Sequence, residues 1–241
     1  METIIKDVKI NYISYGKGKD VLLLHGWGQN IEMMKKVGDG LSNNYRVTIM
    51  DLPGFGKSEE PKEAWTLEDY TEMIEEFVKK KELKDLTIVG HSFGGRIGTI
   101  YASRNKLYRL VLLSSPMIKK KSGNSLKQKV LKFMKKVPLI NKTEGFFKKR
   151  MGSTDYRNAS DMMRKILVNT VNLDLIPYAK KINCPVIFIG GDSDPMVPMY
   201  EVETIEKNIK DCGVIIYPGM DHYAYLEDLY RTINIIKSFL K

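Results

Sequence analysis

The chain has 241 residues, of which 43% are hydrophobic and 28% charged, with a formal charge of +10. These are the proportions of a globular protein large enough for one α/β domain. No stretch reaches the ~18–20 uninterrupted apolar residues of a membrane span, and the first residues lack the apolar block of a signal peptide, so we expect a cytoplasmic protein. Cys184 and Cys212 have neither disulfide nor metal-ligand spacing, and we interpret both as buried small hydrophobic residues.

Short apolar runs alternate with amphipathic stretches along most of the sequence. Residues 3–9 and 10–15 alternate in polarity and predict an N-terminal hairpin. Because the later strand-like runs alternate with helical patterns, we expect an α/β fold with a mostly parallel sheet of about eight strands, flanked by helices. The continuous apolar runs typical of strands buried on both faces lie at residues 21–24, 45–50, 86–89, 110–113, 186–189 and 214–217.

Two segments show the apolar spacing of amphipathic helices most clearly, residues 67–81 and residues 225–240. Thr66 precedes the first segment and Asp69 follows three residues later, which is the arrangement of a capping box. We therefore expect this helix to begin directly after Thr66.

The regular alternation stops after residue 113, and residues 117–181 contain only helical apolar stripes, among them residues 162–167, and many lysines. This segment holds 17 Lys and Arg against 4 Asp and Glu, a net charge of +13, whereas the remainder carries −3. We predict a core domain formed by residues 1–116 and 182–241, interrupted by a helical insertion at residues 117–181.

The charge of the insertion has three interpretations. The lysines belong to the solvated faces of helices, or they form a basic surface that contacts anionic lipid. In the third interpretation, the positive charge steers an anionic substrate or partner toward the protein. Nucleic-acid binding is not expected, because the basic segment lacks interleaved aromatic residues and any known reading motif.

The strongest local motif is GHSFG at residues 90–94, which follows one buried-strand pattern and begins a helical one. A tight turn between strand and helix forces the backbone of Ser92 into a strained conformation and brings its neighbours close together, so that only very small residues fit at the positions of Gly90 and Gly94. Such a turn also presents the hydroxyl of Ser92 at a helix N-terminus, which favours a developing negative charge. We therefore predict that Ser92 is a nucleophile.

A serine nucleophile needs a base, and the chain has only three histidines. His91 precedes the serine and would point the wrong way, and His25 follows an early strand. His222 lies between the last strand pattern and the last helix, so it is the candidate base. For the carboxylate that orients this base, Asp192 and Asp194 both follow a buried strand, and their surroundings leave the choice open.

Taken together, these motifs resemble the α/β-hydrolase fold family over essentially the whole chain, including its order of serine, aspartate and histidine. The resemblance implies that Asp194, which precedes a proline, is the acid, and that Asp221 replaces the glycine common before the histidine. The motifs that carry it are HGWG at residues 25–28, DLPGFGKS at 51–58, GHSFGG at 90–95 and DPMVP at 194–198.

The resemblance also implies an oxyanion hole formed by the backbone N–H groups of Trp27 and Phe93, which we expect to contact substrate as well. The Trp27 side chain lines the pocket or belongs to the core. His25 and Asp51 are expected to brace loops by hydrogen bonds. No metal and no organic cofactor are expected.

The reaction implied by the resemblance is cleavage of a small-molecule carboxylic ester through an acyl-enzyme. A serine at position 92 argues against the dehalogenase and epoxide-hydrolase branches, which use a carboxylate nucleophile. Three alternatives remain: a C–C bond hydrolase, a cofactor-free perhydrolase, and a ligand receptor without catalysis. The loops at residues 25–28 and 51–56 also look similar to carboxylesterases that cleave pimeloyl-carrier-protein methyl esters, in which an acidic carrier docks on a basic cap.

Overall fold

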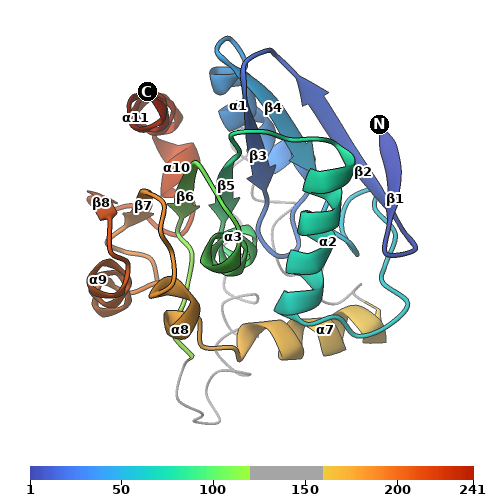
Figure 1. Ribbon diagram of the computed structural model, residues 1–241. Helices are drawn as coiled ribbons and strands as arrows, with labels where there is room; N and C mark the ends of the chain where they lie inside the picture. The colour runs from blue at the N-terminus through green and yellow to red at the C-terminus, as the bar shows by residue number, and fades with distance from the viewer. Residues whose placement is uncertain (120–159) are drawn as a thin grey trace, which may run out of the picture.

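The computed structural model describes residues 1–119 and 160–241. Its eight strands form one sheet in the order β1-β2-β4-β3-β5-β6-β7-β8, and all neighbours from β4 to β8 are parallel (Figure 1). The predicted eight-stranded, mostly parallel α/β fold is therefore confirmed. The strands are β1 (Glu2–Ile5), β2 (Val8–Tyr15), β3 (Lys19–Leu24), β4 (Tyr45–Met50), β5 (Thr87–His91), β6 (Arg109–Leu113), β7 (Val186–Gly191) and β8 (Cys212–Tyr217).

The N-terminal hairpin differs from its predicted boundaries. β1 ends at Ile5 and β2 begins at Val8, with these two residues paired across the turn. The two turn residues, Lys6 and Asp7, both have positive φ angles, 48° and 58°. Two consecutive positive φ angles are typical of a two-residue hairpin turn whose twist matches that of the flanking strands. The residues that usually form such a turn are Asn-Gly or Gly-Gly, whereas here they are Lys and Asp.

Helices cover both faces of the sheet. α2 and α3 pack together on one face, with α8 and α9 beside them, and α1 and α11 pack together on the other (Figure 1). Each face encloses its own apolar cluster, so the central parallel strands are buried on both sides, as their continuous apolar runs predict. The helices are α1 (Ile31–Leu41), α2 (Leu67–Lys80), α3 (Phe93–Arg104), α7 (Asp161–Val171), α8 (Ile176–Ala179), α9 (Met199–Asn208), α10 (Ala224–Glu227) and α11 (Leu229–Leu240).

Of the two most clearly predicted helices, one is confirmed and the other is divided in two. α2 begins after Thr66, and the capping box with Asp69 is formed in both directions, as predicted. The predicted closing helix is divided into α10 and α11, because Asp228 leaves helical geometry and its side chain accepts a hydrogen bond from the backbone N–H of Arg231. Asp228 thus ends one helix and caps the next.

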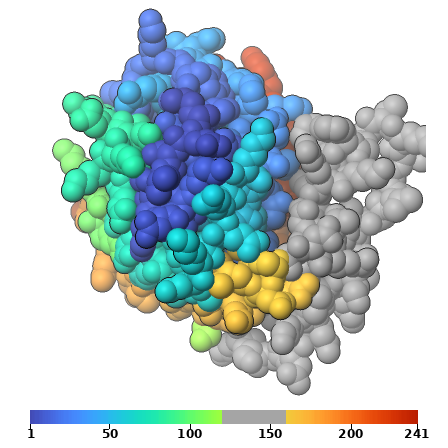
Figure 2. Space-filling view, turned by 90° about the vertical axis from the view of Figure 1, so that its right-hand side faces the viewer, coloured from blue at the N-terminus to red at the C-terminus, as the bar shows by residue number. Residues whose placement is uncertain are grey.

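Of the predicted insertion, residues 120–159 lie outside the described residues, and the domain boundaries stay a prediction. The apolar stripe at residues 162–167 forms part of α7, where Met163 and Ile166 are buried. α7 packs against the loop after β4: Ser160 donates to Glu60 at 2.7 Å, and Asn169 donates to the carbonyl of Ala64 at 3.2 Å. Figure 2 shows the yellow surface of this helix next to the cyan surface of that loop.

Within the described parts of the chain, none of the helices combines the length and the apolar character that crossing a membrane requires.

Candidate active site

Ser92 occupies a strained turn between β5 and α3. Its φ angle of 49° and ψ angle of −108° lie outside the regions that L-residues favour, and its side chain makes no capping hydrogen bond to the helix that it begins. A Cβ atom on Gly90 would lie 2.5 Å from the Cα of Gly95, and a Cβ atom on Gly94 would collide with the backbone of Leu24. The turn therefore requires glycine on both sides of the serine, as its sequence predicts.

His222 and Asp194 are joined by a hydrogen bond. The Nδ1 atom of His222 lies 2.8 Å from Oδ2 of Asp194, and both side chains are buried. The other carboxylate oxygen of Asp194 accepts from the backbone N–H groups of Met196 and Val197, at 2.7 and 3.2 Å. These contacts fix the carboxylate, which in turn fixes the imidazole, so that Nδ1 carries the proton and Nε2 keeps a lone pair.

The charge of Asp194 follows from the same contacts. Burial would raise the pKa of Asp194, but the hydrogen bond and charge of His222 and the two backbone N–H groups outweigh burial and lower it. Asp194 is therefore a carboxylate at neutral pH. Asp192 is exposed and instead accepts from the backbone N–H of Gly219 at 2.7 Å, so of the two candidate acids only Asp194 meets the imidazole.

His91 connects the loop of His222 with the turn of Ser92. Its ring centroid lies 5.0 Å from that of His222, and its Nε2 atom lies 3.2 Å from the backbone carbonyl oxygen of His222. On the other side, its Nδ1 atom lies 3.2 Å from the amide oxygen of Gln29. Burial, followed by the neighbouring His222, lowers the pKa of His91 well below its usual value, so this imidazole stays neutral.

The two loops predicted to be braced by His25 and Asp51 are held in that way. His25 accepts from the backbone N–H of Leu52 at 2.9 Å and donates to the carbonyl of Gly26 at 2.7 Å, which joins the loop after β3 to the loop after β4. Asp51 accepts from the backbone N–H groups of Ile31 and Lys57, at 2.8 and 2.9 Å. The hydrogen bonds of these two side chains do not involve Ser92 or His222.

The stability of the fold is expected to fall between pH 7 and pH 5, because His25 and His91 are both buried histidines with lowered pKa values. Burial lowers the pKa of His25 to about 4, whereas an unfolded histidine titrates near 6.5. As the pH falls, the unfolded chain therefore binds a proton at His25 before the folded chain does. This difference is expected to lower the free energy of unfolding by about 2 kcal/mol between pH 7 and pH 5. Unfolding by urea at several pH values measures this slope.

A His25→Gln variant is the control for that slope. It is expected to be less stable at pH 7, because the N–H of Leu52 loses its imidazole acceptor, and to depend less on pH between 7 and 5. The carboxylates with lowered pKa values, such as Asp194, lose their contribution only at lower pH, below the ordinary aspartate value of 3.8. A wild-type stability that stays flat from pH 7 to pH 5 contradicts the prediction.

Aromatic side chains gather beside Ser92. The ring of Trp27, in the loop after β3, lies edge-on to Phe55 and Phe93, with centroid distances of 4.9 and 5.3 Å. Phe93 also packs on Tyr70 at 5.1 Å, and it is buried whereas Trp27 and Phe55 are only half-buried. The two residues predicted for the oxyanion hole are therefore neighbours, and Trp27 takes part in the edge of the core while remaining partly accessible.

Two residues around this site are not indicated by the sequence motifs. The amide oxygen of Gln29 accepts from the backbone N–H of Gly26 at 2.9 Å and so fixes the loop that carries Trp27. Arg96, one helical turn after Ser92, is buried and binds backbone carbonyls. In the part of the chain that the structure describes, no group of three or more histidine, cysteine, aspartate or glutamate side chains is arranged to hold a metal ion.

Comparison with known proteins identifies the family. The model of the alpha/beta hydrolase fold matches residues 20–142, slightly more than half of the chain. The chain belongs to the α/β hydrolase fold family. A second model, of the dienelactone hydrolase family, matches residues 146–233 of this α/β hydrolase.

Two curated relatives span nearly the whole chain. A pimeloyl-[acyl-carrier protein] methyl ester esterase from Wigglesworthia glossinidia brevipalpis is 27% identical over 247 residues, which cover 92% of the chain and 93% of the relative. A 2-hydroxy-6-oxo-6-(2'-aminophenyl)hexa-2,4-dienoic acid hydrolase from Metapseudomonas resinovorans is 26% identical over 254 residues, which cover 97% of the chain and 88% of the relative.

Among solved structures, a bromoperoxidase from Bacillus anthracis superimposes on this α/β hydrolase with a TM-score of 0.85 and 23% identity, over 100% of this chain and 99% of the other. At that identity the likeness concerns the fold. The family and fold predicted from the motifs are thus confirmed, and the chain is a hydrolase of this family.

Proposed function

We propose that this α/β hydrolase cleaves carboxylic esters with Ser92 as nucleophile, His222 as general base and Asp194 as the residue that orients the base. The observation that carries the proposal is the 2.8 Å hydrogen bond between buried Asp194 and His222, in a loop that contacts the turn of Ser92 through His91. A serine hydroxyl is a weak nucleophile at neutral pH, and a neutral imidazole held by a carboxylate is the group that activates it.

In the first half of the reaction, the Ser92 hydroxyl attacks the ester carbonyl carbon while Nε2 of His222 takes its proton. The carbonyl electrons move to the oxygen, and the negative charge is stabilised by the backbone N–H groups of Trp27 and Phe93. Phe93 is the first residue of α3, so its N–H lies at the positive end of the helix dipole. Each such donor contributes roughly 3 kcal/mol to stabilising the transition state.

In the second half, the tetrahedral intermediate collapses, His222 gives its proton to the departing alcohol, and an acyl group remains on Ser92. Water then attacks this acyl-enzyme while His222 takes a proton from the water, and the acid is released with Ser92 regenerated. Asp194 stays ionised throughout and stabilises the imidazolium that forms in each half. The lowered pKa of Asp194 is consistent with this constant charge.

The aromatic residues beside the nucleophile support an apolar acyl group. Trp27 and Phe55 are half-buried and pack edge-on against each other, and both belong to the apolar cluster that contains Phe93. Both side chains are partly accessible and pack on Phe93, the residue that follows Ser92. Burying an acyl chain against them is favourable at roughly 25 cal/mol per Å².

An ester attached to an acidic carrier protein is the more specific form of the proposal. It is supported by the relative named for a pimeloyl-[acyl-carrier protein] methyl ester, and by the net charge of +13 on residues 117–181, of which 120–159 lie outside the described residues. A positive surface raises the rate at which an acidic protein is encountered, and salt reduces this effect. A purified acidic carrier with a methyl-ester acyl group is expected to be hydrolysed faster than the free acyl methyl ester, with the advantage lost at high salt. Equal turnover of both at low salt contradicts this form.

A second candidate, hydrolysis of a C–C bond next to a carbonyl, is favoured by the relative named for a dienoic acid. The same triad serves both reactions, so substrates must separate them. We expect p-nitrophenyl butyrate to be hydrolysed and a 2-hydroxy-6-oxo-dienoate to be cleaved at least about a hundredfold more slowly, judged by kcat/KM. The reverse order favours the second candidate, and bromination that requires peroxide favours a perhydrolase.

Covalent labelling tests the nucleophile without a knowledge of the substrate. An alkyl fluorophosphonate is expected to add one phosphonyl group per chain, on the peptide that contains Ser92, because the activated hydroxyl displaces fluoride. Intact mass and peptide mapping measure this. A ligand receptor with an inactive triad would remain unlabelled. Labelling of another serine would show that this other residue, and not Ser92, is the nucleophile.

A further inference from the structure

Arg96 links the nucleophile helix to the residue directly before the insertion and to described residues of the insertion itself. It lies in α3, four residues after Ser92, and its side chain is buried. Nη1 donates to the carbonyl of Pro116 at 2.8 Å, and Nη2 donates to the carbonyls of Thr170 and Leu173 at 3.1 and 2.7 Å. One guanidinium thus joins the segment that follows β6 to the segment that follows α7.

The chemistry of these contacts suits a permanent cation. Thr170 belongs to the last turn of α7, where carbonyl groups lack partners within the helix and the dipole is negative. Burial lowers the pKa of Arg96 to about 10, so the side chain remains charged at neutral pH despite the cost of burying it. Hydrogen bonds from a charged donor are about twice as strong as those between neutral groups.

Glu201 holds the same entry segment from the other side. This buried residue of α9 accepts from the backbone N–H groups of Met117 and Ile118, at 2.7 and 2.9 Å. The backbone from Pro116 to Ile118 therefore lies between a buried cation that binds its carbonyl and a buried anion that binds its N–H groups. The charge of Glu201 also favours the charged form of Arg96.

The position of α7 matters for the proposed active site because α7 packs beside the aromatic residues. The side chain of Met163 lies so close to Gly54 that a Cβ atom on Gly54 would collide with the Met163 sulfur. Gly54 is the residue before Phe55. Met163 and Phe93 belong to the same buried apolar cluster, with Trp27 and Phe55 packed against it. A shift of α7 would therefore change the space over the apolar surface next to Ser92.

We propose that Arg96 is a positioning residue that fixes α7 and the Pro116–Ile118 segment relative to Ser92, and that it thereby determines how well long acyl chains are bound. This inference rests on the proposed ester hydrolysis and assigns one of its specificity determinants. Arg96 acts through the two segments and not on the reacting atoms, so its removal changes substrate selection more than the chemical step.

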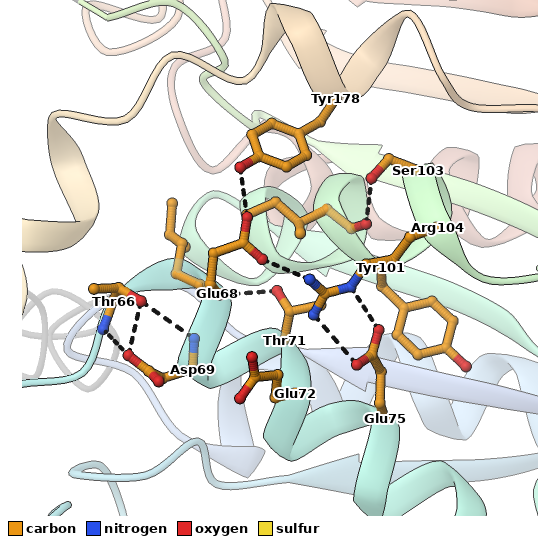
Figure 3. Close-up of polar contacts among 12 residues, drawn as sticks. Thr66, Glu68, Asp69, Thr71, Glu72, Glu75, Tyr101, Ser103, Arg104 and Tyr178 are labelled. Atoms are coloured by element: carbon orange, nitrogen blue, oxygen red, sulfur yellow. Dashed lines mark hydrogen bonds and ion pairs between the residues drawn. The ribbon is translucent and has the colours of Figure 1, made fainter.

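A second arginine of α3 provides a matched control. Arg104 donates to Glu68 and Glu75 of α2 at 2.7 Å each, and Tyr178 of α8 donates to Glu68 at 2.5 Å; Figure 3 shows Glu68 between Tyr178 and Arg104. Replacing Arg104 removes a charged arginine from the same helix. It leaves the contacts of Arg96 in place, together with the bond from Tyr178 to Glu68.

The experiment compares p-nitrophenyl acetate with p-nitrophenyl octanoate for Arg96→Met, Arg96→Lys and Arg104→Met. For Arg96→Met we expect kcat/KM to fall about tenfold or more with octanoate, mainly through KM, and kcat with acetate to change less than about threefold. Arg96→Lys keeps the charge but cannot bind all three carbonyl groups at once. It is expected to raise KM for octanoate only about threefold. Arg104→Met is expected to alter neither ester.

Hydrogen exchange gives a readout that is independent of turnover. Amides of α7 are expected to exchange about tenfold faster in Arg96→Met, with those of α2 unchanged, because the C-terminal carbonyls of α7 lose their donor. An equal loss for both esters, or α7 amides that exchange as in the wild type, overturns the inference. If Arg96→Met does not fold, Arg96→Lys decides by the same two criteria.

The two proposals fail in different ways. Absence of ester turnover in the wild type, or turnover that survives in Ser92→Ala, contradicts the proposed function. Retained ester turnover with no dependence on acyl length in the Arg96 variants contradicts only the positioning role.

Discussion

Replacing Ser92 with alanine is expected to lower kcat for ester hydrolysis by about six orders of magnitude, because the acyl-enzyme can no longer form. The fold should survive, since alanine occupies the same backbone conformation and the Ser92 side chain makes no capping hydrogen bond. We expect the free energy of unfolding to change by less than about 1 kcal/mol. Steady-state turnover of p-nitrophenyl butyrate and urea unfolding measure the two effects.

The control is a double variant. His222→Ala is expected to cause a loss similar to that of Ser92→Ala, and the combination of the two should be no worse than either, because a base has no role without its nucleophile. If the losses multiply instead, the two residues act independently and the proposed mechanism is wrong. Retention of more than about one hundredth of the activity in purified Ser92→Ala would exclude the serine as nucleophile.

The sheet could be predicted from the sequence because of how it is buried. Central parallel strands such as β3 are covered on both faces, and their apolar runs stand out from the amphipathic helices. The hairpin boundaries were wrong because Lys6 and Asp7 form a turn without the residues that usually signal one. The closing helix was predicted as continuous because its apolar spacing runs through Asp228, whereas a cap depends on a local hydrogen bond.

The candidate site could be predicted where it depends on local geometry. The glycines around Ser92 reflect a backbone contact that their own sequence imposes. The choice of Asp194 over Asp192 instead comes from the resemblance to the α/β-hydrolase family, because the residues around the two aspartates leave it open. Arg96 could not be found in this way, since its partners are backbone carbonyls of distant segments. Gln29 could not be found either, although its partner Gly26 is close in sequence, because that bond depends on how the loop folds. A helical arginine and a loop glutamine have no sequence feature that distinguishes them from surface residues.

The three histidines of the chain lie in three different surroundings although their side chains are identical. His25 and His91 are buried among backbone carbonyls and amides, and burial lowers the pKa of both. His222 instead shares a hydrogen bond of 2.8 Å between its Nδ1 atom and the carboxylate of Asp194. Of the three, His222 is therefore the one that we propose as general base, and it differs from the others by its contact with Asp194, which lies in the loop after β7.

Replacing Asp194 with asparagine is expected to lower kcat by about four orders of magnitude while leaving the fold intact. The reason lies in the backbone N–H groups of Met196 and Val197, which will keep the asparagine oxygen as their acceptor. The amide NH₂ then faces Nδ1 of His222 and forces the proton onto Nε2. In that tautomer, the nitrogen that should take the proton of Ser92 is itself a donor.

Asp192→Asn is the matched control, two residues earlier in the same loop. Its side-chain oxygen accepts from the backbone N–H of Gly219 at 2.7 Å, and an asparagine oxygen accepts this bond equally well, so kcat should change less than about threefold. Turnover of p-nitrophenyl butyrate across both variants distinguishes the two carboxylates. The contrary result would be a large loss of kcat in Asp192→Asn together with an active Asp194→Asn. It would mean that Asp194 only supports the loop, because an asparagine that imposes the wrong tautomer on His222 cannot replace a residue that orients the base.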